Sequence, residues 1–283
     1  MLPDLQQAVR RYLGARGVRS SFASLDGYSV HYYALEGIGS GPSTVLVHGL
    51  GASASGFFRL FGGLAKRFRR VLAVDLPGNG FSTYGSDGVP GRKRQVAVLV
   101  RFLEEIARQP AFLVGSSLGG AMSIIVSHRR PELVQALGLI APAGARVPEP
   151  RLAELLTSLD CRTAAQARAL TRRLFHHTPY AALLFAGFLR RMYSSEVVRA
   201  MLAEIQPSDC LEPEVLQGLR MPTLLIWGES EKLLPYESID FFRQYLPASA
   251  EIRVVKGFGH VPQMERPGEL VRHLIDFADR FSL

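Results

Sequence analysis

A serine at the centre of a glycine turn is the first residue in the sequence that could carry out chemistry. Ser117 stands in a Gly-x-Ser-x-Gly pattern, between the apolar, strand-like run 112–114 and the apolar, helix-like run 121–128. A strand, a sharp turn and a helix are the context in which a nucleophile elbow presents a serine hydroxyl above a sheet. Gly115 and Gly119 suit such a turn because it leaves little room for side chains. We predict that Ser117 is a nucleophile rather than part of an ordinary Gly/Ser turn.

A serine hydroxyl is a poor nucleophile at neutral pH and needs a base close by. His260 is the best candidate among seven histidines, because it lies in a Gly-x-Gly-His-x-Pro loop after the strand-like run 251–255. Its imidazole can take the serine proton and later return it to the leaving group. A carboxylate behind the imidazole would fix its tautomer and stabilise the imidazolium. Glu229 and Glu231 follow the buried run 223–228 and are the candidates for that acid.

A second glycine-rich loop follows an earlier apolar strand. Residues 44–48 read TVLVH and continue as HGLG over 48–51. Acyl transfer requires backbone N–H groups that bind the oxygen of the tetrahedral intermediate. We predict that the N–H groups of Leu50 and Leu118 do this, with Gly49 beside them. The alternative is an ordinary glycine-rich loop.

Strand-like and helix-like runs alternate along much of the chain. The expected strands are 20–25, 28–34, 44–48, 71–74, 112–114, 136–144, 223–228 and 251–255; the expected helices include 95–108, 121–128, 236–245 and 267–281. Asp26-Gly27 is a strong hairpin signal between the first two strands. Asp75 ends the fourth strand, and we expect it to hold the following turn rather than to act in catalysis. This alternation predicts an α/β fold with a mainly parallel sheet covered on both faces.

The pattern changes between about Arg146 and Gly218, where helical stretches rich in Arg, Leu, Phe and Tyr replace buried strands. We predict a helical cap or lid at 146–218, inserted into a core formed by 1–145 and 219–283. The apolar run 181–189 is too short to span a bilayer and fits a helix over an apolar pocket, an interfacial lid or an ordinary core helix. His176 and His177 show no metal-ligand spacing and are expected to be surface or packing residues.

Composition excludes several other classes of protein. The 283 residues are 47% hydrophobic and 20% charged, as in a globular protein. The net charge of +8 comes from dispersed arginines, and without a zinc spacing or an RNA-binding signature we expect no nucleic-acid partner. Two cysteines, Cys161 and Cys210, do not make a disulfide framework, although they could pair, so a reducing, cytoplasmic location is expected. Nothing in the sequence requires a metal or an organic cofactor.

The N-terminus reads as an amphipathic helix. Over residues 1–14, apolar residues at helical spacing alternate with polar and basic ones, which is not the pattern of a signal peptide. This helix either docks on its own protein or touches a membrane surface, and the cap offers a second surface for peripheral membrane contact.

Taken together, these motifs resemble the α/β-hydrolase superfamily over essentially the whole chain. The matching elements are His48-Gly49, Asp75-x-Pro-Gly-x-Gly-x-Ser82, Gly115-x-Ser117-x-Gly119, Trp227-Gly228 and Gly259-His260. The resemblance implies an eight-stranded, mostly parallel sheet flanked by helices, with a cap after the sixth strand. It also implies that the acid lies a few residues beyond Trp-Gly, where the family commonly has aspartate. Here that position holds Glu231, and Glu229 is the alternative.

Within the superfamily, the chain resembles bacterial lipases, esterases and monoacylglycerol lipases. The resemblance implies cleavage of carboxylic esters, possibly of monoacylglycerol-like substrates, through an acyl-enzyme on a Ser117–His260–Glu231 triad. One alternative is a carbon–carbon bond hydrolase of meta-cleavage products, although those enzymes commonly have Trp where Val261 follows the histidine. Another is a catalytically silent member of the fold that binds a small apolar ligand. The oligomeric state is not indicated.

Overall fold

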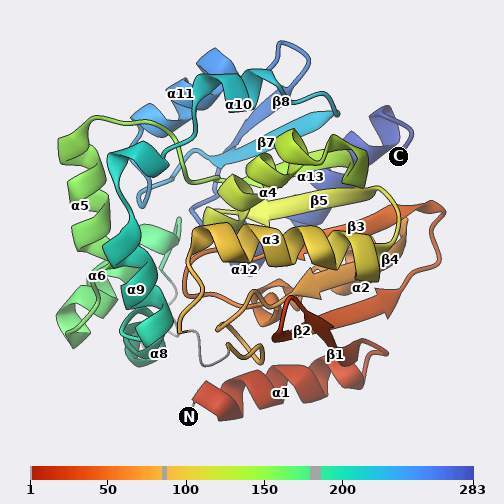
Figure 1. The fold of residues 1–283 in the computed structure, drawn as a ribbon, viewed down its shortest axis with the longest axis horizontal. Helices are drawn as coiled ribbons and strands as arrows, with labels where there is room; N and C mark the ends of the chain where they lie inside the picture. Colours follow the sequence, from red (N-terminus) through yellow and green to blue (C-terminus); the bar gives the residue numbers. More distant parts are fainter. Residues whose placement is uncertain (1, 85–87, 179–185) are drawn as a thin grey trace.

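The structure is a computed structural model, and it describes residues 2–84, 88–178 and 186–283. Eight strands form one sheet in the order β1-β2-β4-β3-β5-β6-β7-β8 (Figure 1). Their bounds are β1 Arg19–Leu25, β2 Tyr28–Glu36, β3 Gly41–Val47, β4 Phe68–Val74, β5 Ala111–Ser116, β6 Val134–Ile140, β7 Thr223–Gly228 and β8 Glu251–Val255. β2 pairs antiparallel with β1 and β4, and every other neighbouring pair is parallel. The predicted mostly parallel eight-stranded sheet is confirmed.

Helices connect the strands and cover the sheet. They are α1 Leu2–Gly14, α2 Phe61–Leu64, α3 Arg92–Phe102, α4 Leu118–Arg129, α5 Glu149–Leu159, α6 Ala164–Leu174, α8 Ala186–Tyr193, α9 Glu196–Glu204, α10 Pro213–Gln217, α11 Glu237–Tyr245, α12 Pro262–Glu265 and α13 Pro267–Arg280. The sixth strand ends four residues earlier than predicted: Ala141 has a φ of 41°, and Pro142 cannot donate to a ladder. None of the helices in the described ranges has the length and apolarity needed to cross a membrane.

Successive residues of the central strands pack on opposite faces of the sheet. Val45 and Val47 belong to one apolar cluster, which includes residues of α3, α4, α10 and α11. Leu46 lies between them in sequence and belongs to the other cluster, with residues of α1, α2 and α13. Side chains alternate along a strand, so a strand buried on both faces is apolar throughout. This is why the sequence shows continuous apolar runs for the central strands.

Between β6 and β7, the described helices α5, α6, α8 and α9 stand apart from the sheet in Figure 1. We call them the inserted helices. Residues of these helices form most of a third apolar cluster, and Leu50 and Leu155 pack against both this cluster and one of the core clusters. Of the apolar run 181–189, residues 181–185 lie outside the described residues, and α8 begins at Ala186. The limits 146–218 for a cap remain a prediction.

Candidate active site

Ser117 lies at the turn between β5 and α4, in a backbone conformation that side chains seldom adopt. Its φ of 54° and ψ of −120° fall outside the helical and strand regions. Hydrogen bonds hold this strained residue: its N–H donates to Ile140 O at 2.9 Å, and its carbonyl accepts from Gly120 N at 2.8 Å and Ala143 N at 3.0 Å. Strained residues persist where neighbours over-determine them, and they cluster at functional sites.

The glycines on either side of Ser117 are required by neighbouring backbone. A Cβ on Gly115 would lie 2.4 Å from the carbonyl oxygen of Gly119. A Cβ on Gly119 would lie 2.3 Å from the carbonyl oxygen of Val47, at the end of β3. The sharp turn therefore depends on two close backbone approaches, and the β3 loop lies directly beside the elbow.

The structure brings His260 and Glu231 into direct contact. The His260 Nδ1 atom lies 2.7 Å from Glu231 Oε2, and the two side chains are 4% and 3% exposed. The second carboxylate oxygen, Oε1, accepts from the N–H groups of Leu233 at 2.7 Å and Leu234 at 3.0 Å. Both oxygens of this buried carboxylate therefore have hydrogen-bond partners, as a buried charge requires.

The surroundings keep Glu231 ionised. Burial raises the pKa of its carboxyl, but the charge of His260 and the hydrogen bonds from His260, Leu234 and Leu233 outweigh burial and leave the pKa below its ordinary value. Glu229, the alternative acid, has an exposed side chain, and its N–H pairs with Val255 in the β8 strand. The structure therefore places Glu231, and not Glu229, behind the imidazole.

Ser117 and His260 are not joined by a hydrogen bond among those recorded for the described residues. Both residues follow the carboxyl ends of parallel strands, β5 and β8, on the same edge of the sheet. Catalytic hydrogen bonds are often long without substrate and tighten in the complex. The structure thus shows an oriented imidazole and a serine at a sharp strand-to-helix turn, without a recorded hydrogen bond between the two side chains.

Two backbone N–H groups near Ser117 have no recorded hydrogen-bond acceptor among the described residues. Leu50 lies in the turn after β3 and Leu118 is the first residue of α4; no hydrogen bond from either N–H is recorded in the described part of the chain. A Cβ on Gly49 would lie 3.0 Å from Ser117 Cβ, so Gly49 packs against the serine. Leu50 and Leu118 line the same cavity as Ser117, and their oxyanion role remains a prediction.

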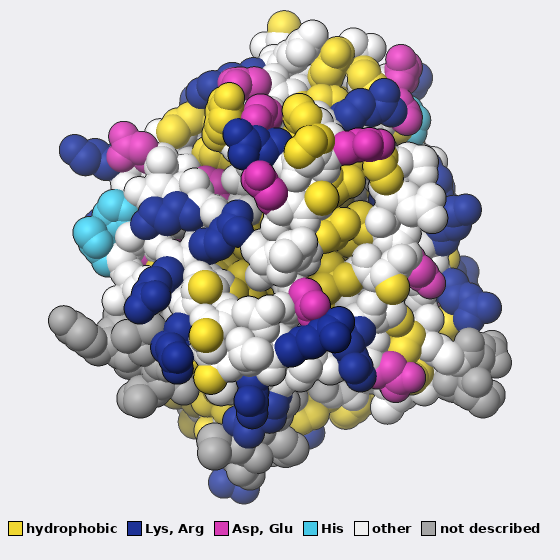
Figure 2. Space-filling model, turned by 90° about the vertical axis from the view of Figure 1, so that its left-hand side faces the viewer, with side chains coloured by type: hydrophobic (Ala, Val, Ile, Leu, Met, Phe, Trp, Pro, Cys, Tyr) yellow, Lys and Arg dark blue, Asp and Glu magenta, His cyan; other side chains and the backbone are white. Residues whose placement is uncertain are grey.

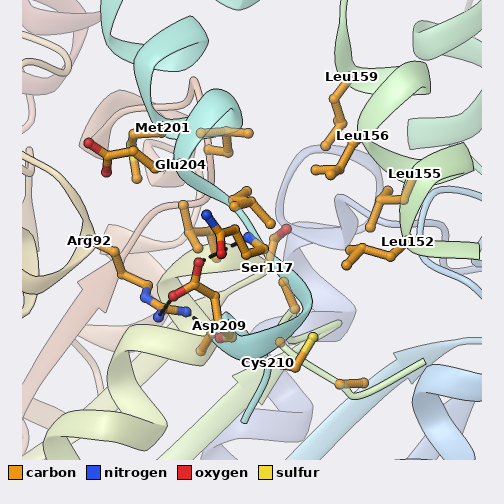
Figure 3. Close-up of a pocket in the computed structure, with 18 of the residues that line it drawn as sticks. Arg92, Ser117, Leu152, Leu155, Leu156, Leu159, Met201, Glu204, Asp209 and Cys210 are labelled. Atoms are coloured by element: carbon orange, nitrogen blue, oxygen red, sulfur yellow. Dashed lines mark hydrogen bonds and ion pairs between the residues drawn. The ribbon is translucent and has the colours of Figure 1, made fainter. Parts of the chain in front are cut away.

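Ser117 opens into a cavity of about 530 Å³. In Figure 3 the serine lies between two unlike ends of this cavity. On one side α5 presents Leu152, Leu155, Leu156 and Leu159. The other side carries charge. There Arg92, in α3, forms an ion pair with Asp209, and Glu204 stands nearby. An apolar pocket with a few polar groups is the usual form of a small-molecule site.

Comparisons with known proteins agree with this geometry. A family profile described as "alpha/beta hydrolase fold" matches residues 42–267. The chain belongs to the α/β-hydrolase family.

Relatives of this α/β hydrolase include enzymes with different substrates. It is 26% identical over 260 residues to 2-hydroxymuconate semialdehyde hydrolase of Pseudomonas putida, covering 84% of this chain and 88% of that protein. It is 24% identical over 261 residues to monoacylglycerol lipase ABHD6 of Rattus norvegicus, covering 84% and 76%. Among solved structures, a bacterial membrane phospholipase A described as a virulence factor superposes with a TM-score of 0.84 and 27% identity, covering 98% and 91%.

Sequence reasoning missed the role of one histidine in this α/β hydrolase. The buried His48 accepts from the N–H of Leu76 through Nε2 at 3.1 Å, so its Nδ1–H donates to Gly49 O at 2.8 Å. Burial lowers the pKa of His48, which keeps the ring neutral and suited to this pairing. His48 thus ties the loop of Leu50 to the loop after β4. A buried histidine after a strand was the only available signal.

Asp75 has the structural role expected for it. Its carboxylate accepts from the N–H groups of Ala54 at 2.7 Å and Phe81 at 3.0 Å, and it contacts His31 Nδ1 at 2.7 Å. His31 Nε2 in turn lies 2.7 Å from Ser20 Oγ. This second chain of serine, histidine and aspartate is not part of the cavity lining.

Neither the cysteines nor the remaining titratable groups suggest further chemistry at the site. Cys161 and Cys210 are both free thiols, so they do not pair. Within the described residues, no cluster of His, Cys, Asp or Glu could hold a metal ion.

Proposed function

We propose that this α/β hydrolase cleaves carboxylic esters through an acyl-enzyme, with Ser117 as nucleophile, His260 as base and Glu231 as the orienting acid. The observation that carries the proposal is the buried contact of 2.7 Å between His260 Nδ1 and Glu231 Oε2, beside an elbow serine. A carboxylate at Nδ1 fixes the tautomer that leaves Nε2 free to accept a proton.

The steps follow from this arrangement. The Ser117 oxygen attacks the ester carbonyl while His260 Nε2 takes its proton, and the N–H groups of Leu50 and Leu118 bind the oxyanion. The imidazolium then protonates the departing alcohol, which leaves the acyl group on Ser117. Water attacks the acyl-enzyme with His260 again as base, and the carboxylic acid and free serine are restored.

The two ends of the cavity suit an ester that is apolar on one side and polar on the other. The leucines of α5 offer an apolar wall for an acyl chain. The charged end near Arg92 and Glu204 can face a polar alcohol portion. Relatives named as a monoacylglycerol lipase and a phospholipase A act on substrates of this form, which supports a monoacylglycerol-like ester for this chain.

Carbon–carbon bond hydrolysis is the second candidate, because a relative is named 2-hydroxymuconate semialdehyde hydrolase. Against it stands Val261, which follows His260 where such enzymes commonly carry Trp. A silent, ligand-binding member of the fold would be favoured if the acid could not reach the imidazole. The contact between Glu231 and His260 argues against that alternative.

We further propose that the inserted helices form a cap over the cavity and that peripheral membrane contact occurs on this side. Residues 161–195 contain six arginines and no Asp or Glu. Arg168, Arg172 and Arg190 are exposed. Figure 2 views this side and shows Lys and Arg side chains over its lower left part, without acidic ones among them. Tyr193, the last residue of α8, lines the cavity, so this surface adjoins the site. A cytoplasmic location remains a prediction.

Fluorophosphonate labelling, read by mass spectrometry, tests the proposed function together with assays on short- and long-chain p-nitrophenyl esters. A stoichiometric adduct on Ser117 with ester turnover is the expected result. Turnover of a vinylogous diketone without ester turnover would favour the carbon–carbon hydrolase. Folded protein with neither adduct nor turnover would favour the silent ligand-binding protein.

A further inference from the structure

The loop that carries His260 is tied to the inserted helices through its backbone. The N–H of His260 donates to the carbonyl of Leu174, the last residue of α6, at 2.9 Å. Glu265, the last residue of α12, accepts from the N–H of Gly259 through Oε2 at 2.9 Å. Its other oxygen, Oε1, accepts from the N–H of His176 at 2.6 Å. One carboxylate therefore joins the residue before His260 to the segment after α6.

The two backbones lie in close contact at this point. A Cβ on Gly259 would lie 2.6 Å from His176 N and 2.8 Å from Glu265 Oε2. Any side chain larger than hydrogen at 259 would push the histidine loop away from α6 or away from the carboxylate. The contact therefore fixes where the loop can stand.

The same segment also holds the loop of the acid. Arg173 donates from Nε to the carbonyl of Lys232 at 2.8 Å and from Nη2 to that of Leu233 at 3.1 Å, directly after Glu231 in the chain. His176 Nδ1 lies 2.6 Å from Ser230 Oγ, directly before Glu231. Both loops that meet in the His260–Glu231 contact are thus held by residues 173–176.

We propose that Glu265 is a positioning residue, whose carboxylate holds the His260 loop against the segment after α6 and so keeps the imidazole in contact with Glu231. Arg173 acts in the same way on the loop of the acid. The assignment rests on the proposed function in one respect, namely that His260 is the base. Under this assignment, the end of α6 positions the two loops that carry His260 and Glu231.

A carboxylate suits this position because it accepts two backbone N–H groups at once, one from each side. Burial raises the pKa of the Glu265 carboxyl, and hydrogen bonds from Gly259, His176 and His177 oppose that rise by stabilising the charged form. A glutamine of the same shape would turn an NH₂ group toward one of these N–H donors. One hydrogen bond would be replaced by two donors facing each other, which is costly when half-buried.

The test compares Glu265→Gln with Glu269→Gln, an α13 glutamate whose ion pair with Arg266 lies at the surface. We expect Glu265→Gln to lower kcat on a short p-nitrophenyl ester about 10–100-fold with KM nearly unchanged, since small misplacements of a catalytic group have effects of this size. Glu269→Gln should behave as wild type.

A purely structural role predicts otherwise: Tm falls, while kcat of the folded fraction stays at the wild-type value. That result would overturn the proposal. Should Glu265→Gln fail to fold, Arg173→Lys takes its place, with the exposed neighbour Arg172→Lys as control. Lysine keeps the charge but lacks the two separate nitrogens, Nε and Nη2, with which Arg173 donates to the two carbonyls. The same fall in kcat is therefore expected. A wild-type kcat would count against the proposal.

A measurement without substrate separates this proposal from the proposed function. The low-field NMR signal of the His260 Nδ1 proton reports the contact with Glu231 directly. We expect it to shift or broaden in Glu265→Gln and to stay in Glu269→Gln, whether or not the wild-type protein hydrolyses esters. An unchanged signal in Glu265→Gln would contradict the positioning role even if ester hydrolysis is confirmed.

Discussion

At the scale of single residues, the site depends on backbone strain and on one buried contact between an imidazole and a carboxylate. Ser117 keeps a φ of 54° because backbone hydrogen bonds and two close glycine contacts hold it. His260 has its tautomer fixed by Glu231, whose two oxygens are both engaged. Each of these residues therefore acts in an orientation that its neighbours set before substrate arrives.

Removing the nucleophile or the base should abolish ester hydrolysis. We expect Ser117→Ala and His260→Ala each to lower kcat by at least about 10⁴-fold, because the members of a triad act as a unit. Ser20→Ala is the matched control, since Ser20 also contacts a histidine paired with aspartate but lies outside the cavity lining. Wild-type rates in Ser117→Ala would refute the mechanism, and loss of activity in Ser20→Ala would require a second site.

Replacing the acid should affect both rate and stability. Glu231→Gln leaves the imidazole without its anionic partner, and we expect kcat to fall by about 10³–10⁴-fold. The corresponding control is Glu229→Gln, whose side chain is exposed. A nearly normal Glu231→Gln with an inactive Glu229→Gln would move the acid to Glu229.

The stability effect of Glu231 has a defined pH dependence. Its folded pKa is lowered from 4.5, so its ionised contacts contribute stability that is present above the ordinary pKa and lost as pH falls through the lowered value. The gap in free energy of unfolding between wild type and Glu231→Gln, about 1–3 kcal/mol at neutral pH, should narrow below pH 4.5. Urea denaturation at several pH values measures it, and a gap that widens there would contradict the assigned contacts.

At the scale of elements, α5 is the feature most open to a direct test of substrate shape. Its leucines line the cavity, whereas Ala153 lies on the exposed side of the same helix. If this wall receives the acyl chain, blocking it should affect long substrates more than short ones. In that case, the cavity-facing side of α5, and not the catalytic residues, discriminates between long-chain and short-chain esters.

We expect Leu156→Trp to lower kcat/KM for a long-chain p-nitrophenyl ester by about tenfold or more, because the indole occupies space that acyl methylenes need. The acetate ester should be cleaved at close to the wild-type rate. Ala153→Trp adds the same side chain on the outer face and should change neither rate. An equal loss on both esters would mean that α5 does not define the acyl site.

The elements were predictable to the extent that their signals are local. Continuous apolar runs indicated the central strands, because these are buried on both faces, and alternating patterns joined by Asp26-Gly27 indicated the first two strands. The packing of α5, α6, α8 and α9 was not predictable, since the apolar face of a helix does not indicate which element it packs against. In the site, motifs pointed to Ser117 and His260. Glu265 and Arg173 left no signal because they hold backbone groups, which any sequence supplies.

At the scale of the whole molecule, the positive charge is unevenly placed. Residues 161–195 carry six arginines without an acidic residue, and Tyr193, within this stretch, lines the cavity. Juxtamembrane basic residues near an anionic surface are each worth about 1 kcal/mol. We therefore expect this cationic face beside an apolar pocket to favour substrates held in an anionic lipid surface.

This surface should bind vesicles that contain phosphatidylglycerol more strongly than neutral phosphatidylcholine vesicles, and salt should weaken the binding. The double variant Arg168→Glu/Arg172→Glu should reduce cosedimentation by about tenfold or more, while Arg272→Glu, an exposed α13 arginine, should have a smaller effect. If both variants lose binding equally, the interaction depends on net charge alone. Equal binding of both vesicle types would exclude this role for the arginines.

The contact between the end of α6 and the two catalytic loops also affects whether the helical insertion can be exchanged between members of the family. A helical insertion that only shapes a pocket could be replaced by another of similar length. Here residues 173–176 bind the Ser230 side chain before Glu231, the carbonyls of Lys232 and Leu233 after it, and the N–H of His260. A chimera that imports the insertion of a relative should therefore keep this short stretch from the recipient, or import the matching loops with it. Within the family, we therefore expect recombination breakpoints that keep residues 173–176 together with the two catalytic loops, and not breakpoints at the ends of the insertion.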